Sequence, residues 1–383
     1  MPKSTVYEAK IKHYQLLDEQ GTLDESMFSK HGNDRLSDKD AVLLYEEMVT
    51  CRHFDEIAFK LQRSGRMGTY PQNKGQEAGP GGAGLAIRNH APGSWIVPCY
   101  RENIALFLNG LPKENILLPW MGDERGNAIP DGVNQMPFSV PIGTHPLHAT
   151  GIAWGLKYAA DRAGRENNRV AVSFIGDGAT SEGDVHEALN FAGVLKAPMI
   201  LMVQNNGWAI SVPREKQTAS ETFAQKAFAY GIHGVRCDGN DIFASYKLMT
   251  EAIERALKDG KPTLIETLTY RLGDHTTADD ARRYRDEEEL QAWIKKDPLI
   301  RTRKYLESKD LWDEKKQIAL EARAKEEVAA VVEKSLNIEK PAVTDIFDYT
   351  FETLDPELRR QRETMGTSGL EQFPQQQGLS AGV

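Results

Sequence analysis

The chain has 383 residues, which is enough for one large α/β domain or two ordinary ones with a substantial core. Its composition, with 40% hydrophobic and 27% charged residues, is ordinary for a globular protein in water. A formal net charge of −9 argues against a nucleic-acid surface, which usually needs a basic face. No apolar run approaches the roughly 20 residues that a membrane-spanning helix needs. We therefore expect neither a nucleic acid nor a membrane as partner.

The amino terminus and the cysteines bear on the compartment. Residues 1–20 carry mixed charge and lack the apolar core of a secretory signal. Cys51, Cys99 and Cys237 are far apart and form no metal-type pair. They are expected to be small, partly buried residues of a reduced compartment, so we predict a cytoplasmic protein.

The first elements are an arm, a capped helix and a glycine-rich helix. Residues 1–36 are polar and irregular, which predicts an arm that lies on another surface. Ser37 and Asp40 form a capping pattern for a helix that ends near Gly65. Five glycines in the segment 75–89 favour close packing of backbone against backbone, which we expect at an interface between subunits. A strand (95–97), a helix (104–108) and a long ordered loop (120–141) follow.

From residue 144 onward, helices and strands alternate. This rhythm predicts an α/β fold with a mostly parallel sheet covered by helices on both faces, and a helical C-terminal extension beyond Asp286. Gln, Gly and Ser predominate from Met365, which predicts a mobile ending. The predicted helices are 146–162, 183–195, 219–230, 241–258 and 311–334, and the predicted strands are 170–175, 199–203, 235–237 and 263–270. We divide the chain into an N-terminal arm (1–36), an α/β domain (37–285), a helical C-terminal part of the same domain (286–340) and an extended tail (341–383).

Two polar motifs follow neighbouring strands of this predicted sheet. One apolar run ends in Gly176-Asp177-Gly178, and the next ends in Asn205-Asn206. The stretch between them is long enough for the helix and returning strand of a βαβ crossover. Because open α/β sheets bind ligands at the carboxyl ends of their strands, we expect Asp177 and Asn206 to converge there.

An acid and an amide beside a glycine-lined helix start suit a divalent cation that holds a diphosphate. The amides after Gly178 can point at phosphate oxygens. Magnesium prefers about six oxygen ligands, and Asp177, Asn206 and the main-chain carbonyl of Trp208 fit that need. The alternative is a glycine turn and an asparagine-rich loop without any ligand, which the pairing of both motifs at this spacing disfavours.

The paired motifs resemble the thiamine-diphosphate signature, Gly-Asp-Gly followed by two asparagines. Over roughly residues 40–335 the chain resembles the alpha subunits of the 2-oxo acid dehydrogenases, and among them the bacterial pyruvate dehydrogenase alpha subunits. The resemblance implies a thiamine-diphosphate-binding fold with thiamine diphosphate and Mg²⁺ as cofactors. The segments that carry it are 75–78, 100–102, 176–211, 273–277, 284–285 and 295–299.

The resemblance also implies which residues hold the cofactor. Tyr100 and Arg101 match a pair that reaches the diphosphate, in keeping with the planar paired donors of a guanidinium. Val140 and Ile142 match positions that bracket the aminopyrimidine, the second of which keeps the cofactor bent. The implied cofactor-binding residues are Tyr100, Arg101, Val140, Ile142, Asp177, Gly178, Ala179, Asn206 and His275, and the implied metal ligands are Asp177, Asn206 and Trp208.

Among these residues we predict one catalytic side chain. His275 matches a histidine near the diphosphate and the substrate entrance, and its imidazole could donate a proton during transfer to a lipoyl group. Thr276 stands where animal homologues carry a regulatory serine, which speaks against phosphorylation here. We read Glu182 as an acid favoured by a helix start and Glu77 as an interface contact.

In the resembled family the glutamate that activates the pyrimidine ring belongs to a separate beta subunit. The chain has one diphosphate-type site and no second α/β module of similar length. We therefore expect an α2β2 heterotetramer in which this chain is inactive alone. The implied reaction is an oxidoreductase step: oxidative decarboxylation of pyruvate, linking glycolysis to acetyl-CoA, with acetylation of a lipoyl group on the transacetylase core of the complex.

The motifs leave alternatives for the substrate and for the class of function. Gln204 matches pyruvate-type subunits, whereas the segment 181–184 reads like a branched-chain 2-oxo acid dehydrogenase; an acetoin dehydrogenase is a third possibility. A non-catalytic phosphate-binding regulator and a scaffold subunit with relic motifs are the readings from other classes.

Overall fold

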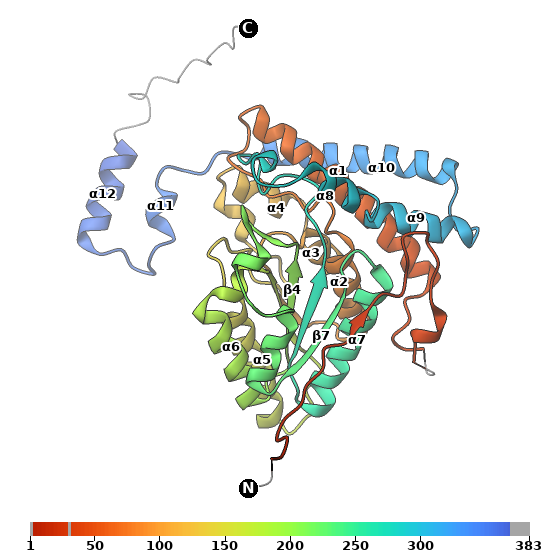
Figure 1. Ribbon diagram of the computed structural model, residues 1–383. Helices are drawn as coiled ribbons and strands as arrows, with labels where there is room; N and C mark the ends of the chain where they lie inside the picture. Colours follow the sequence, from red (N-terminus) through yellow and green to blue (C-terminus); the bar gives the residue numbers. More distant parts are fainter. Residues whose placement is uncertain (1–2, 30–31, 368–383) are drawn as a thin grey trace. The chain divides into compact units, whose positions relative to one another are not determined.

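The computed structural model describes residues 3–29 and 32–367 of the chain. The chain divides into two compact units, the first of which ends at Ser335 and the second of which begins at Leu336. The first unit is built around a parallel sheet with helices on both faces (Figure 1). The predicted α/β class is confirmed.

The sheet has six strands in the order β1-β7-β8-β4-β3-β2, and all neighbouring pairs are parallel. Five of these strands were predicted, and the sixth, β1, comes from the N-terminal arm. It is two residues long, too short to show a period in the sequence. The strands are β1 (His13–Tyr14), β2 (Trp95–Val97), β3 (Ala171–Gly176), β4 (Met199–Asn205), β7 (His233–Asp238) and β8 (Thr263–Leu268); β5 (Trp208–Ala209) and β6 (Val212–Pro213) form a separate antiparallel pair.

Helices cover both faces of the sheet because its central strands are apolar on both sides. Along β4, Leu201 and Val203 join one hydrophobic core and Ile200 and Met202 join the other. One core contains α1 (Asp38–Arg63), α2 (Ala78–His90), α3 (Asn103–Leu108), α4 (Glu114–Trp120) and α7 (Ile242–Asp259). The other contains α5 (His145–Arg162), α6 (Gly183–Leu195) and the 3₁₀ segment η5 (Phe223–Tyr230).

The glycine-rich helix α2 is close-packed, but within this chain. A Cβ on Gly82 would lie 2.8 Å from the carbonyl oxygen of Ile242 in α7, and one on Gly84 would lie 2.7 Å from Cα of Ala105 in α3. Residues 78–87 are all buried. Our expectation that these glycines form an interface between subunits is therefore wrong, because α3 and α7 already cover them.

The N-terminal arm is part of the first unit. The main-chain N–H groups of Leu16 and Leu17 donate to Oδ2 of Asp241 at 2.6 and 2.7 Å, and both leucines are buried. Asp241 also caps the start of α7 by accepting from Phe243 and Ala244. The arm expected to lie on another surface thus lies along its own sheet edge.

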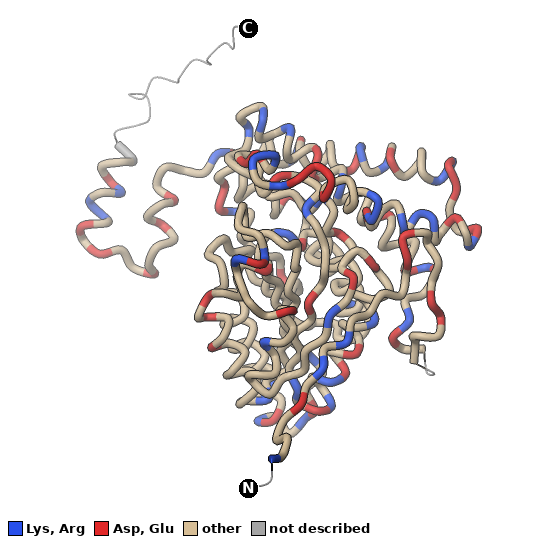
Figure 2. Tube along the Cα trace, viewed as in Figure 1, with Lys and Arg blue, Asp and Glu red and all other residues tan. Residues whose placement is uncertain are grey.

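Charged helices follow the sheet. Figure 2 shows acidic and basic residues interspersed along α10. The second unit holds α11 and α12 where we expected an extended tail; Asp355 accepts from the amides that begin α12, a local cap. The predicted mobile ending falls mostly on residues outside the described part of the chain. These helices are α8 (Glu287–Ile294), α9 (Pro298–Ser308), α10 (Glu314–Leu336), α11 (Asp345–Asp348) and α12 (Pro356–Thr367).

Within residues 3–29 and 32–367, none of the helices combines the length and the apolar content that crossing a bilayer requires.

Candidate active site

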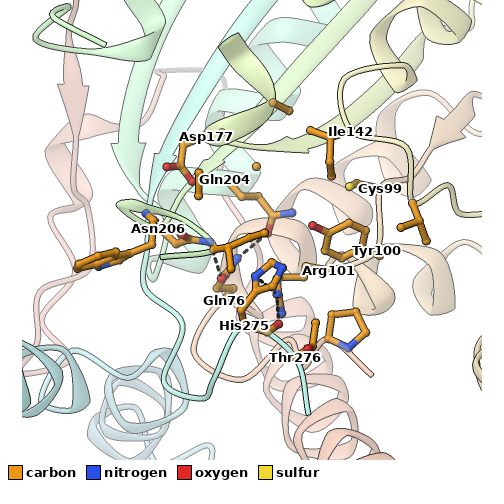
Figure 3. Close-up of a pocket in the computed structure, with 18 of the residues that line it drawn as sticks. Gln76, Cys99, Tyr100, Arg101, Ile142, Asp177, Gln204, Asn206, His275 and Thr276 are labelled. Atoms are coloured by element: carbon orange, nitrogen blue, oxygen red, sulfur yellow. Dashed lines mark hydrogen bonds between the residues drawn. The ribbon is translucent and has the colours of Figure 1, made fainter. Parts of the chain in front are cut away.

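A cavity of about 450 Å³ lies where β3 and β4 end (Figure 3). The two strands are parallel, with Gly176 beside Gln204, so the residues after them emerge at one edge of the sheet. The structure thus brings both motifs to one pocket, while the roles of the residues as ligands stay predictions. All ten residues predicted at the site line this cavity: Tyr100, Arg101, Val140, Ile142, Asp177, Gly178, Ala179, Asn206, Trp208 and His275.

Asp177 directly follows β3, at the start of the 3₁₀ turn η3 (Gly178–Ser181). Its side chain is 1% exposed, and its Oδ2 accepts from Nε2 of Gln217 at 2.9 Å. Burial raises the pKa of this carboxyl, while Gln217 and the main-chain N–H of Asn206 favour its charged form. A cation beside Asp177 would replace the hydration that burial has removed.

The turn η3 fits tightly against the loop that follows β4. A Cβ on Gly178 would lie 2.7 Å from Cβ of Ala209 in β5. Glycine at this position therefore lets η3 approach the segment that carries Trp208, whose carbonyl is a predicted metal ligand.

The two asparagines point to different partners, and only the second lines the pocket. Nδ2 of Asn205 donates to Oε1 of Glu266 at 2.7 Å. Nδ2 of Asn206 donates to Oε1 of Gln76 at 3.1 Å, and its Oδ1 accepts from the main-chain N–H of Trp208 at 3.1 Å. Burial and these two bonds fix the carboxamide that we predicted as a ligand.

Arg101 and His275 face each other in the pocket (Figure 3). Nη2 of Arg101 lies 3.1 Å from Nδ1 of His275 and also donates to its carbonyl oxygen, while Nη1 donates to the carbonyl of Gln72 at 2.5 Å. Because a guanidinium only donates, Nδ1 must be the acceptor. The neutral imidazole therefore carries its proton on Nε2.

His275 is held in its neutral form. Burial, with the nearby charges of Arg101 and Arg271, lowers the pKa of His275 to about 3. At neutral pH the ring thus has one proton, on Nε2. A ring of this kind can donate that hydrogen bond without carrying a charge.

Arg271 is a pocket-side residue that the sequence argument missed. It is 2% exposed, and its Nη2 donates to the carbonyl of Ile210 at 2.8 Å, whereas its Nε and Nη1 have no partner within the described residues. Burial, followed by the charge of Arg101, lowers the pKa of Arg271 to about 10. Its position just after β8, at the same sheet edge as Asp177, was the available signal.

Arg271 also holds a strained residue of the pocket wall. Ile210 lines the cavity and has a φ of +54°, a backbone conformation that β-branched residues rarely adopt. The hydrogen bond from Arg271 to its carbonyl fixes that conformation. Strain of this kind gathers at ligand sites, where the surroundings enforce it.

One side of the pocket is open. Val140 and Ile142 line the cavity, yet they are 52% and 42% exposed. They lie in the irregular segment before α5, where Trp120 stacks on Phe138 with ring centroids 4.9 Å apart. The described residues of this chain therefore leave that side of the cavity uncovered.

Behind the pocket, Glu77 corrects a prediction. We expected it at an interface between subunits, but it is fully buried. Its Oε1 accepts from Nε of Arg52 at 2.5 Å and its Oε2 from the main-chain N–H of Gly75 at 2.9 Å. These contacts fix the turn that places Gln76 in the pocket.

The polar groups of the pocket fall into two sets that together fit a metal-bound diphosphate. Asp177, Asn206 and the carbonyl of Trp208 offer oxygen atoms for a cation, whereas Arg101 offers donors for phosphate oxygens. Arg271 does not line the cavity, but two of its buried donors have no partner among the described residues. Among the described residues no group of three or more His, Cys, Asp or Glu is placed to hold a metal. The predicted donor set is of another kind, with one carboxylate, one carboxamide and one main-chain carbonyl.

A strand-end pocket with a buried carboxylate and a guanidinium group is typical of an α/β protein that binds a charged ligand at its sheet edge. Comparison with known proteins makes this specific. The dehydrogenase E1 component family matches residues 45–344, and the chain belongs to this family.

The relatives are named proteins of similar length. "Pyruvate dehydrogenase E1 component subunit alpha" of Staphylococcus epidermidis is 42% identical over 358 residues, which cover 93% of each chain. The protein of the same description from Staphylococcus aureus is 41% identical over the same length. The resemblance inferred from the motifs is confirmed, and membership of the family implies thiamine diphosphate as the cofactor.

Proposed function

We propose that this chain is the alpha subunit of the pyruvate dehydrogenase (acetyl-transferring) E1 component, an oxidoreductase that acts on a 2-oxo acid with a lipoyl disulfide as acceptor. The observation that carries the proposal is the convergence of Asp177 and Asn206 in one buried pocket of a chain 42% identical to such subunits. A phosphate-binding regulator would not need this donor set together with an open aromatic-backed side.

The cofactor pair is thiamine diphosphate with Mg²⁺. Asp177, Asn206 and the carbonyl of Trp208 would hold the cation, and Arg101 and Arg271 would face the diphosphate. When bound, thiamine diphosphate supplies the electron sink for decarboxylation.

The protein's own contribution is placement, exclusion of water and one hydrogen bond. The buried floor of the pocket orients the charged end of the cofactor. His275 keeps its proton on Nε2 because Arg101 occupies Nδ1. We assign to that Nε2–H the donation of a hydrogen bond to the lipoyl sulfur during transfer, which stabilises the developing thiolate while the neutral ring keeps its proton.

A beta subunit is the proposed partner, in an α2β2 assembly that meets the lipoyl-bearing transacetylase core. Helices α5 and α6 carry exposed apolar side chains, of which Val194 is 74% exposed, and a Cβ on Gly151 or Gly155 would meet no atom within 4 Å. A partner seated there would lie beside the open side of the pocket, because α6 begins next to Glu182, which lines the cavity. The other large exposed apolar side chains of these helices are Trp154, Tyr158 and Phe191.

We place the assembly in the cytoplasm. The support for this proposal is three buried free cysteines, which suit a reduced compartment.

The test is turnover by the chain assembled with its beta subunit, with and without thiamine diphosphate and Mg²⁺. Pyruvate should be the best substrate, and 3-methyl-2-oxobutanoate and acetoin should be turned over more slowly. A preference for 3-methyl-2-oxobutanoate would make the chain a branched-chain subunit, as the segment 181–184 suggested. Full decarboxylase turnover by the chain alone, or no calorimetric uptake of thiamine diphosphate, would contradict the proposal.

A further inference from the structure

Four buried side chains form a hydrogen-bonded row along the pocket wall. Nδ2 of Asn206 donates to Gln76, Nε2 of Gln76 lies 3.4 Å from Oε1 of Gln204, and Nε2 of Gln204 donates to Oε2 of Glu102 at 3.2 Å. Each member is at most 6% exposed and each lines the cavity. Figure 3 shows Gln76 between Gln204 and Asn206.

Every amide in this row donates in the same direction. A carboxamide has a donor end and an acceptor end, so turning one amide alone would set oxygen against oxygen or NH₂ against NH₂. Because the four side chains are buried, such mismatches are costly, which makes the row a unit with one favoured direction.

The two ends of the row fix that direction. At one end the main-chain N–H of Trp208 can only donate, and it does so to Oδ1 of Asn206. At the other end Oε2 of Glu102 also accepts from the main-chain N–H of Arg101 at 3.0 Å. That oxygen is therefore committed as an acceptor.

The direction does not depend on the charge of Glu102. Burial raises the pKa of this carboxyl to about 8, so it can carry a proton near neutral pH. Its other oxygen, Oε1, is buried and has no partner within the described residues, and a proton would sit there. Oε2 accepts in either state.

We propose that Glu102 is a positioning residue that, through Gln204 and Gln76, keeps the oxygen of the Asn206 carboxamide turned toward the cation. The inference rests on the cation site of the proposed function. The proposal gives a role to Glu102, a buried acid that forms no salt bridge among the described residues although it follows Arg101 in the sequence. The sequence motifs assigned it no role. Glu102 touches neither cation nor substrate in this arrangement.

The test measures the dissociation constant of Mg²⁺ by calorimetry, using the chain assembled with its beta subunit and saturated with thiamine diphosphate. Glu102→Met removes the acceptor and should weaken Mg²⁺ binding about 10-fold, the lower end of the effect of removing outer-shell partners. Glu102→Gln keeps an oxygen for Arg101 and Gln204 and should stay within about threefold of the unaltered protein.

Gln204, which links Glu102 to Gln76, gives a second test of the same proposal. Gln204→Met should also cost about 10-fold in Mg²⁺ affinity, and Glu102→Met should add no further loss in that background. The matched control is Glu266→Met, because Glu266 is an equally buried acid that accepts from Asn205, the asparagine outside the cavity. Thermal unfolding checks each variant, and Gln204→Met decides the question if a Glu102 variant does not fold.

Three outcomes would overturn the inference. Equal losses in Glu102→Met and Glu102→Gln would mean that only the charge matters. If Glu102→Met lowers Mg²⁺ affinity as much in the Gln204→Met variant as in the unaltered protein, the effect does not pass along the row. Unchanged affinity in Glu102→Met and Gln204→Met would mean that the row is packing only. If the unaltered assembly fails to bind Mg²⁺ at all, the proposed function fails instead, so the two failures are distinct.

Discussion

The floor of the pocket, formed by Asp177, Asn206 and Gln76, and its rim, formed by Val140 and Ile142, differ in how fully this chain encloses them. The floor residues are at most 6% exposed and each has a hydrogen-bond partner inside the chain. The rim residues are about half exposed although they line the same cavity. The difference indicates that this chain encloses the floor of the pocket and leaves the rim exposed, on the side where the proposed beta subunit would sit.

The difference has a structural cause. Asp177 and Asn206 follow strands whose register is set by main-chain hydrogen bonds, so their positions are fixed by the sheet itself, and Gln76 is bonded to Asn206. Rim residues lie in an irregular segment before α5, which has no such ladder. Four predictions either break this contrast or sharpen it.

The largest effect is expected at the floor. Asp177→Ala removes the only carboxylate of the proposed cation site. The loss of Mg²⁺-dependent thiamine diphosphate affinity should exceed about 100-fold, beyond the usual effect of removing outer-shell partners. Calorimetry on the assembled protein measures it, with Asp259→Ala on the exposed end of α7 as the control. Retained affinity would remove the floor from the binding site.

A smaller effect is expected where the second chain should sit. Val194→Asp places a charge on the exposed apolar face of α6 and should weaken association with the beta subunit about 30-fold, as for a moderate interface hot spot. Ile318→Asp on α10 is the matched control, because Ile318 is 61% exposed on a different helix. Sedimentation or gel filtration at several concentrations measures association. Equal behaviour of both variants would show that α6 is not the partner face.

The next largest effect is expected from removing the buried guanidinium of Arg271. Arg271→Met removes two nitrogen donors that have no partner among the described residues, so thiamine diphosphate affinity should fall about 10-fold. Because a buried guanidinium with two unsatisfied donors costs stability, the melting temperature of the ligand-free chain should stay level or rise. Calorimetry measures the affinity and thermal unfolding measures the stability, so together they separate a binding role of Arg271 from a structural one. A clear drop in melting temperature with unchanged affinity would make Arg271 structural, through its bond to Ile210.

The floor was also the part that the sequence could predict. Asp177 and Asn206 stand next to buried strands, and a parallel sheet must bring the ends of adjacent strands together. The partners of these residues could not be read in this way. Gln76 and Asn206 are 130 residues apart, and neither has a local pattern that names the other. The prediction that the α2 glycines form an interface between subunits failed for the same reason. No local pattern shows that α7, which is distant in the sequence, packs on them.

The smallest effect concerns pH and lies between floor and rim, at His275. The folded chain holds the pKa of His275 near 3, whereas an unfolded histidine titrates near 6.5. As pH falls below 6.5, the histidine takes up a proton in the unfolded state but not in the folded state. The contribution of His275 to the stability of the fold is therefore fully present above pH 6.5 and is lost toward pH 3.

The test replaces His275 by glutamine, which cannot titrate but still offers Arg101 an acceptor oxygen. His275→Gln should therefore flatten the fall in melting temperature between pH 6.5 and 4 by about 2 °C, after discounting for partial exposure. His148→Gln, at an exposed position on α5, should leave the slope unchanged. An unaltered slope in His275→Gln would mean that burial and the charge of Arg101 do not hold the ring neutral, and Nε2 would then lose its assignment as the donor of the hydrogen bond.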